Sequence, residues 1–278
     1  FTLPGKLFPK LVGARDLTKE VLDEWYSYFN QCSECRRCSV FCPYGIDTAE
    51  VTMAAREILD SVGYGQKYSN EIIGKVHRIG NNLGLPGPAL EDTLAGLEED
   101  VKDATGVDVK FPMDVQGAEV LLITPSADFF AEPHIDSLIG YAKVFHATGT
   151  SWTLSSIASE AGNFGMFIGN YDQLRKIALR IRQAALELGV KRIVVGECGH
   201  AWRVAYSFWN TLTGVGDGAD EIDQFAQMLQ KQLDHRYKQP THICEFTWDA
   251  IQAGKLKFDT AKNDKFTITF HDSCNVAR

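Results

Sequence analysis

The chain has 278 residues, of which 45% are hydrophobic and 23% charged, and its net charge is −8. This length suffices for one large domain or two ordinary ones, while the negative charge argues against a general nucleic-acid binder, which needs clustered lysine and arginine. No apolar run approaches the roughly 18 to 20 residues of a membrane-spanning helix, and no secretory signal opens the chain.

The two ends of the sequence suggest that the polypeptide continues. It begins with Phe1 rather than methionine, and it stops at "HDSCNVAR", directly after a predicted strand and loop. We therefore expect any site near Arg278 to be incomplete. The seven cysteines are an odd number with uneven spacing, which is a poor disulfide framework but fits metal ligation in a reducing compartment. The cytoplasm is the expected location.

The first part of the chain is predicted to be helical. Residues 16–30 carry apolar side chains at helical spacing, and a cysteine cluster follows in residues 32–43. Asp47 is the expected N-cap of the next helix, with Glu50 three residues later in a capping-box pattern. Two further helical patterns occupy residues 70–112. A helix, a cysteine loop and a second helix form the layout of a cluster-binding module.

From about residue 117 the pattern changes to strands alternating with helices. Short apolar runs predict three strands, which end in loops at residues 124–128, 196–203 and 271–278. The amphipathic run 171–189 predicts a helix. This alternation indicates an α/β fold with a mostly parallel sheet, in which the loops at the carboxyl ends of the strands share one edge.

The cysteine cluster reads "CSECRRCSVFCP" and contains Cys32, Cys35, Cys38, Cys42 and Pro43. Thiols at this spacing, followed by proline, are typical of a loop that holds a [4Fe–4S] cubane. Zinc is the competing ligand, but zinc sites usually combine two separated Cys-x-x-Cys pairs. Either all four thiolates hold one cubane, or the fourth ligand is remote and Cys42 serves another purpose.

Two later loops share a second pattern, in which a strand is followed by a cysteine, a nearby histidine and an arginine. Because both are expected at the same sheet edge, we predict that they contribute to one site. The first loop, "GECGHAWR", contains Cys198, His200 and Arg203; the second, "HDSCNVAR", contains His271, Asp272, Cys274 and Arg278.

The remaining cysteine and histidines are expected to be structural. Cys244 is flanked by apolar positions and is predicted to be a small buried side chain. The other histidines lack ligand spacing and are expected on the surface or in satisfied core positions. These are His77, His134, His146, His235 and His242.

Together these motifs resemble the heterodisulfide-reductase-type iron–sulfur subunits with cysteine-rich CCG domains, and among them most the DsrK type, from the membrane complex linked to dissimilatory sulfite reduction. The resemblance covers nearly the whole chain and implies four segments. These are a helical ferredoxin-like [4Fe–4S] module (residues 1–66), a helical connector (67–115), a first CCG-type α/β domain (116–265) and the start of a second, truncated one (266–278).

The first CCG-type domain departs from the family pattern. Ala161 and Gly162 stand near the expected cysteine pair, and of the later cysteine pair only Cys198 is kept. This domain therefore cannot hold a cluster of its own. The resemblance makes Cys274, and less directly Cys198, ligands of a second, non-cubane [4Fe–4S] cluster where substrate sulfur is reduced.

By this resemblance the chain would be the catalytic iron–sulfur subunit of a membrane-associated oxidoreductase in sulfur metabolism. It would lie on the cytoplasmic face of the inner membrane, take electrons from a haem-b quinol-oxidising subunit, and reduce a disulfide or trisulfide on a small sulfur-carrier protein. His200 and His271 would be proton donors and Arg203 would balance charge, or all three would merely orient the cysteine loops.

Two other functions stay open at this stage. The first is a non-catalytic electron carrier of the glycolate oxidase or glycerol-3-phosphate dehydrogenase type. The second is a zinc-bearing structural scaffold, which would give a colourless protein. The sequence does not identify the physiological substrate, the reduction potentials or the stoichiometry of the complex.

Overall fold

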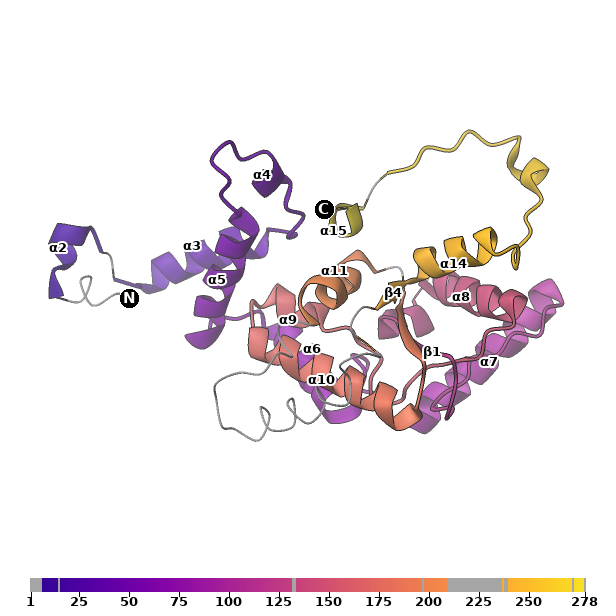
Figure 1. Cartoon of the computed structure of the whole chain (residues 1–278). Helices are drawn as coiled ribbons and strands as arrows, with labels where there is room; N and C mark the ends of the chain where they lie inside the picture. Colours follow the sequence, from indigo (N-terminus) through magenta and orange to yellow (C-terminus); the bar gives the residue numbers. More distant parts are fainter. Residues whose placement is uncertain are drawn as a thin grey trace.

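The computed structural model describes residues 7–14, 16–131, 134–196, 198–209, 237, 240–271 and 273–277. The N-terminal part of this described chain is helical (Figure 1). Its helices are α2 (Pro9–Val12), α3 (Lys19–Asn30), α4 (Arg37–Val40), α5 (Thr48–Ser61), α6 (Lys67–Ile79) and α7 (Gly87–Thr105).

The rest of the described chain is built around a parallel sheet with the strand order β2-β1-β3-β4. The strands are β1 (Val120–Ile123), β2 (Trp152–Thr153), β3 (Arg192–Val195) and β4 (Thr241–His242). The helices are α8 (His134–Thr148), α9 (Asn163–Phe167), α10 (Tyr171–Leu188), α11 (Gly199–Ser207), α14 (Ile243–Gln252) and α15 (Cys274–Ala277), with 3-10 turns η1 (Ser126–Phe129) and η2 (Thr260–Asn263). The predicted α/β class is confirmed.

Alternate side chains of the central strand β1 face two separate cores. Leu121 and Ile123 pack with α6, α9, α10 and α11, whereas Val120 and Leu122 pack with α7, α8 and α14. The sheet is thus covered by helices on both faces, which explains why the central strand β1 is apolar at every position rather than alternating.

Local signals fix the ends of the helices close to where the sequence predicts them. Thr18 caps α3 by accepting a hydrogen bond from the Val21 N–H. Asp47 caps α5 through the N–H groups of Ala49 and Glu50, as expected. Helix α10 spans the predicted residues and ends at Gly189 in a left-handed conformation.

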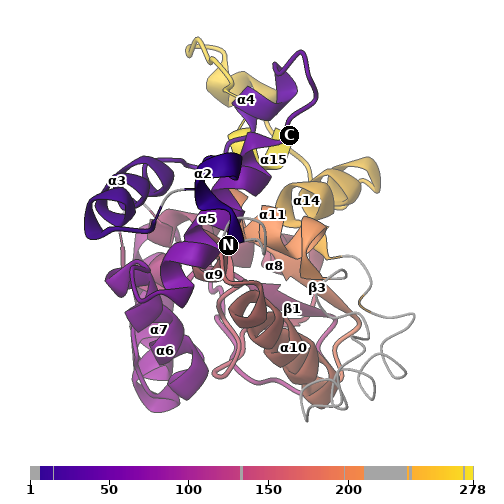
Figure 2. The ribbon, with the colours of Figure 1, turned by 90° about the vertical axis from the view of Figure 1, so that its left-hand side faces the viewer.

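The helical N-terminal part is packed onto the α/β part through α5. Met53 of α5 belongs to the core on the α10 side of the sheet. Gly169, between α9 and α10, has φ +68°, and a Cβ there would lie 2.5 Å from the Met53 carbonyl oxygen. This close approach needs glycine. Figure 2 shows α5 lying over α9, with α4 and α15 at the same end of the molecule.

The third predicted strand, residues 265–270, is wrong as a strand. These residues are not paired in a sheet, and Phe266, Ile268 and Phe270 are exposed. Their alternation of apolar and polar side chains is typical of a strand, but strand structure also needs a neighbouring strand to hydrogen-bond. The two short strands β2 and β4, which the sequence did not indicate, complete the sheet instead.

None of the helices in the described part of the chain is long and apolar enough to cross a membrane.

Candidate functional site

The cysteine loop, residues 32–42, connects α3 to α5 and encloses the short helix α4. Glu34 and Arg36 alternate with cysteines and both adopt left-handed backbone conformations, with φ values of 56° and 57°. Such turns point backbone N–H groups into a concavity that suits anionic groups, including iron–sulfur clusters. The Glu34 N–H donates a hydrogen bond of 3.4 Å to the Cys32 Sγ.

The loop is anchored from below by a buried ion pair. Arg56 of α5 donates to the carbonyl oxygens of Phe29 (3.0 and 2.7 Å) and Cys32 (2.5 Å). Its Nη1 lies 3.5 Å from the Glu34 Oε1, and the two residues are 3% and 0% exposed. Burial raises the pKa of the Glu34 carboxyl, although the charges of Arg56 and Arg203 oppose this. The pair fixes where the loop leaves α3.

A second set of contacts joins the outer part of the loop to the start of α5. Ser39 donates to the Asp47 Oδ1 at 2.7 Å, and Arg36 pairs with the Glu50 Oε1 at 2.9 Å. The Cys38 Sγ is in hydrogen-bonding contact with the Thr48 hydroxyl. The N-cap of α5 therefore also holds the cysteine loop.

The donor chemistry of the loop fits an iron–sulfur cluster. It offers four thiols within eleven residues, left-handed turns between them and a backbone N–H directed at a cysteine sulfur, and N–H···S hydrogen bonds are among the features that tune such clusters. Among the described residues no three Cys, His, Asp or Glu side chains gather around a point where one metal ion would sit. A cubane does not require this, because each of its irons takes one thiolate. That Cys32, Cys35, Cys38 and Cys42 are the ligands stays a prediction.

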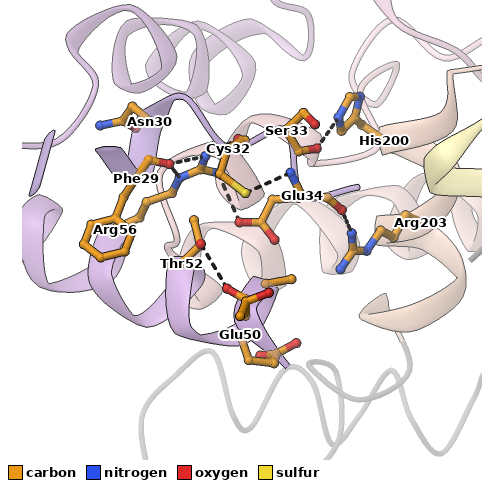
Figure 3. Close-up of polar contacts among 12 residues, drawn as sticks. Phe29, Asn30, Cys32, Ser33, Glu34, Glu50, Thr52, Arg56, His200 and Arg203 are labelled. Carbon is orange, nitrogen blue, oxygen red and sulfur yellow. Dashed lines mark hydrogen bonds and ion pairs between the residues drawn. The ribbon is translucent and has the colours of Figure 1, made fainter. Parts of the chain in front are cut away.

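Helix α11, which begins at the predicted loop "GECGHAWR", contacts the cysteine loop directly (Figure 3). His200 donates from Nε2 to the Ser33 carbonyl oxygen at 3.3 Å, and Arg203 donates to the Glu34 carbonyl oxygen. The His200 ring also meets Phe167 edge-on. Burial lowers the pKa of His200, so that the neutral imidazole is favoured. Two of the predicted site residues are thus brought to the first cysteine motif.

The C-terminal cysteine segment lies against the same helix. Asn275 accepts a hydrogen bond of 3.3 Å from Arg203, and a Cβ at Gly199 would lie 2.9 Å from the Ser273 hydroxyl oxygen. Cys274 is the first residue of α15, which packs against α11. His271 is exposed and is not brought into this contact. The three cysteine-bearing segments therefore meet at α11, although the third does not arrive through a strand.

Cys198 is the N-cap residue of α11, at the carboxyl end of β3. Burial raises the pKa of its thiol, partly offset by the N–H groups of Ala201 and His200, and the negative charges of Glu160 and Asp128 act in the same direction as burial. A thiol in this environment favours its protonated form.

An acid cluster, defined here as Ser126, Asp128 and Glu160, occupies this edge of the sheet. Glu160 is 1% exposed, and its Oε1 accepts from the Ser126 N–H at 2.8 Å and from the Ser126 hydroxyl at 2.5 Å. Thr124 donates to Asp128, which pairs with His134 at 3.6 Å. Burial raises the pKa of Glu160. Carboxyl and hydroxyl groups thus gather where the chain leaves the carboxyl end of β1.

The prediction for Cys244 is wrong, because this residue is exposed. Helix α14 buries Ile243, Phe246 and Ala250, and the residue after Ile243 falls on the solvent side.

The remaining histidines behave as expected where the structure describes them. His77 contacts Gln173 at 2.5 Å, His134 and His146 are exposed, and His242 is buried beside Trp202 and caps α14. His235 lies outside the described residues.

Glu34 and Arg56 are the site residues that the sequence analysis missed. The position of Arg56 could have revealed this pair. Arg56 lies seven residues after Ala49 and three after Met53, which is helical spacing, so it shares the buried face of α5 with them. A charged residue on a buried helix face indicates a buried partner.

Comparison with known proteins gives relatives over the entire chain. This chain is 39% identical over 297 aligned residues to the Hdr-like menaquinol oxidoreductase iron-sulfur subunit of Archaeoglobus profundus. It is 40% identical over 295 aligned residues to the Hdr-like menaquinol oxidoreductase iron-sulfur subunit 2 of Archaeoglobus fulgidus. Each alignment covers all of this chain and 53% of the relative. A subunit of the dihydromethanophenazine:CoB–CoM heterodisulfide reductase of Methanosarcina barkeri is 26% identical over 97% of this chain and 58% of its own length.

The chain thus spans about half the length of the curated relatives it matches. The comparisons support the resemblance to heterodisulfide-reductase-like iron–sulfur subunits, and do not single out the DsrK type. No protein-family model and no solved structure matches the chain.

Proposed function

We propose that this chain is an iron–sulfur electron-transfer part of a membrane-associated oxidoreductase of the heterodisulfide-reductase-like kind. The observation that carries the proposal is the contact between the cysteine loop and α11, through His200 and Arg203. This contact places the predicted electron-receiving loop beside the segments that contain Cys198 and Cys274. The names of the relatives, which are menaquinol oxidoreductase and heterodisulfide reductase subunits, support the same function.

In this proposal Cys32, Cys35, Cys38 and Cys42 hold a [4Fe–4S] cubane. A cluster bound there would accept and release single electrons. The protein would position and tune the cluster, since Arg56 fixes the start of the loop and the Glu34 N–H is directed at a ligand sulfur.

The second part of the proposal concerns the substrate. Cys274 and Cys198 would contribute to a second, non-cubane [4Fe–4S] site, where a disulfide or trisulfide is reduced. Reduction of a disulfide consumes two electrons and two protons and yields two thiols. The electrons would come from a quinol through a haem-b subunit, and the acceptor would be a sulfur-carrier protein on the cytoplasmic face, as in the DsrK-type complexes that the sequence resembles.

A carrier without substrate chemistry is the second candidate function. It is favoured by one specific observation, namely that the segments following β1 and β2 bring together the acid cluster and contain no cysteine. In that case the chain would only pass electrons between the cubane and a partner dehydrogenase.

The test is iron and acid-labile sulfide quantification with EPR on intact protein purified without oxygen. We expect a cubane signal that Cys35→Ser abolishes, whereas Cys244→Ser, at an exposed position away from the loop, leaves it unchanged. A colourless, zinc-loaded protein would contradict the proposal.

The same preparation separates the two candidate functions. A second iron signal that changes when a disulfide is added supports the reductase, and iron sufficient for one cubane alone supports the carrier. Cys42→Ser shows whether this residue is the fourth ligand, since loss of the cubane signal requires that it is.

A further inference from the structure

We propose that Arg203 is a positioning residue that ties the cysteine loop to the C-terminal cysteine segment and thereby sets the separation of the two. The inference rests on the proposed function, because it assigns both segments to one electron path. Of the two roles that the sequence suggests for Arg203, it favours orientation of the cysteine loops over charge balance.

The geometry shows one guanidinium shared by two distant parts of the chain, and Figure 3 shows its contact with Glu34. Nη1 of Arg203 donates to the Glu34 carbonyl oxygen in the cysteine loop and to the Asn275 Oδ1, 3.3 Å away, in α15. These partners are 169 and 72 residues from Arg203 in the sequence. No backbone hydrogen bond in the described part of the chain joins the two segments, and the Arg203 side chain from α11 contacts both.

Both hydrogen bonds of Arg203 are buried, so their loss is costly. Arg203 is 4% exposed and Asn275 is 8% exposed. Removing one partner of a buried hydrogen bond leaves the other unsatisfied, and the cost is larger for a charged group. Both accepting groups are neutral, which suits a bridging role better than charge balance.

The surface of α11 is shaped for the C-terminal segment as well. Gly199 lies in the first turn of the helix, where a Cβ would come within 2.9 Å of the Ser273 Oγ and 3.4 Å of the Asn275 Cβ. The absence of a side chain at Gly199 lets α15 approach closely enough for Asn275 to reach Arg203. Two independent features, a small residue and a buried bridge, thus act on the same segment.

The charged groups around Arg203 belong to the N-terminal helical part of the chain. Burial lowers the pKa of Arg203 and Arg36 acts in the same direction, while Glu34, Asp47 and Glu50 oppose them. All four neighbours belong to the cysteine loop or the start of α5. The guanidinium keeps its charge because its ordinary pKa is far above neutrality.

A fixed separation is what an electron path across two segments requires, because functional groups need supporting contacts to hold them in place. The cysteine loop carries two left-handed residues, and the C-terminal segment arrives after a stretch that is exposed from Phe266 to His271. Neither segment is held by a strand. Arg203 therefore adds to the anchor that Arg56 gives the loop a contact that is shared with the C-terminal segment.

The experiment is hydrogen exchange, followed by mass spectrometry, on the intact protein with and without iron. In Arg203→Met we expect residues 32–36 and 273–277 to exchange about tenfold faster, and in both segments together. Arg203→Lys should behave like Arg203→Met, because the lysine side chain ends one atom short of the position of Nη1 and its ammonium would not reach both acceptors. If Lys restores protection in both segments, charge rather than bridging is the role, and the proposal fails.

Two further variants serve as controls. Asn275→Ala should loosen residues 273–277 while residues 32–36 keep their protection. Arg180 is a matched arginine that donates to the carbonyl oxygens of Ile157, Val76 and His77, away from the cysteine loop. Arg180→Met should therefore leave both segments unchanged.

Unchanged exchange in either segment of Arg203→Met would overturn the proposal. General unfolding of Arg203→Met would be recognised by faster exchange in β1 too. In that case the exchange of residues 32–36 and 273–277 in Arg203→Lys decides between bridging and charge. The iron content of the unmodified protein tests the proposed function separately. Loosening of both segments in a protein that never binds iron would support the bridge and contradict the function.

Discussion

The carboxylate of Glu34 and the guanidinium of Arg56 lie 3.5 Å apart beneath the cysteine loop, and both side chains are almost completely buried. Neither carboxylate oxygen of Glu34 has a hydrogen-bond partner among the described residues, so Arg56 is its main compensation. A buried ion pair gives little net stability, but loss of one partner leaves an uncompensated charge. Its value here is geometric, since Arg56 also binds Phe29 and Cys32.

Arg56→Met should lower the free energy of unfolding by roughly 3–5 kcal/mol. It leaves the buried Glu34 carboxylate without its ion-pair partner and two carbonyl oxygens without their hydrogen-bond donor. The double variant with Glu34→Gln should recover part of this loss. Urea unfolding followed by circular dichroism measures both. Lys19 and Asp23 form an exposed pair, and Lys19→Ala should change stability far less than Arg56→Met does. Equal losses at Arg56 and Lys19 would show that the buried pair has no special role.

The Glu160 carboxyl should make stability depend on pH. Burial raises its pKa above the ordinary value of 4.5, so the folded protein binds this proton more tightly than the unfolded chain does. Its contribution is therefore complete below that value and is lost as the pH rises through the folded pKa.

Glu160→Gln keeps a side-chain oxygen that can accept from Ser126, but it cannot ionise. Relative to this variant, the unmodified protein should lose stability on going from about pH 5 to about pH 8, by about 1.4 kcal/mol for each pH unit by which the folded pKa exceeds the unfolded one. Urea titrations at several pH values measure the difference. Parallel curves for the two proteins would mean that Glu160 ionises normally.

Substitutions of His200 and His271 should have different effects, the first on stability and the second on disulfide turnover. His271 is exposed, so His271→Ala should leave the free energy of unfolding within about 0.5 kcal/mol while lowering disulfide turnover at least about a hundredfold if it donates a proton. His200→Ala should instead cost about 1 kcal/mol of stability, because it removes the contact with the Ser33 carbonyl. Turnover in the assembled complex and urea unfolding give both values. Full activity of His271→Ala would exclude it as the acid.

The sequence allowed a correct prediction of those elements whose apolar pattern is long or continuous. Helix α10 and strands β1 and β3 follow from such patterns, and the N-cap role of Asp47 follows from its side chain. Strands β2 and β4 contain two residues each, and no periodicity can be detected over that length.

The site was predicted in its parts but not in its assembly. The sequence pointed to His200 and Arg203 as neighbours of a cysteine, but not to their contacts with Ser33 and Glu34, because these lie about 170 residues away. The unpaired segment with Phe266 shows the opposite limit, since its pattern indicates a strand and only a partner strand can make it one. Long-range pairing depends on the tertiary fold and leaves no local pattern.

The approach of α5 to the turn between α9 and α10 should be sensitive to a single methyl group. Gly169→Ala places a Cβ 2.5 Å from the Met53 carbonyl oxygen and 2.7 Å from the Glu57 nitrogen, at a positive φ. Because these contacts are with helix backbone that cannot shift alone, the variant should lose more than about 2 kcal/mol of stability and loosen the packing of the cysteine module. Gly149 is the matched control, since its φ is +65° but nothing lies within 4 Å of its Cβ position. Gly149→Ala should cost only about 1 kcal/mol of backbone strain. Thermal unfolding of both variants measures the difference, and equal shifts in Tm would mean that α5 does not depend on this contact for its position.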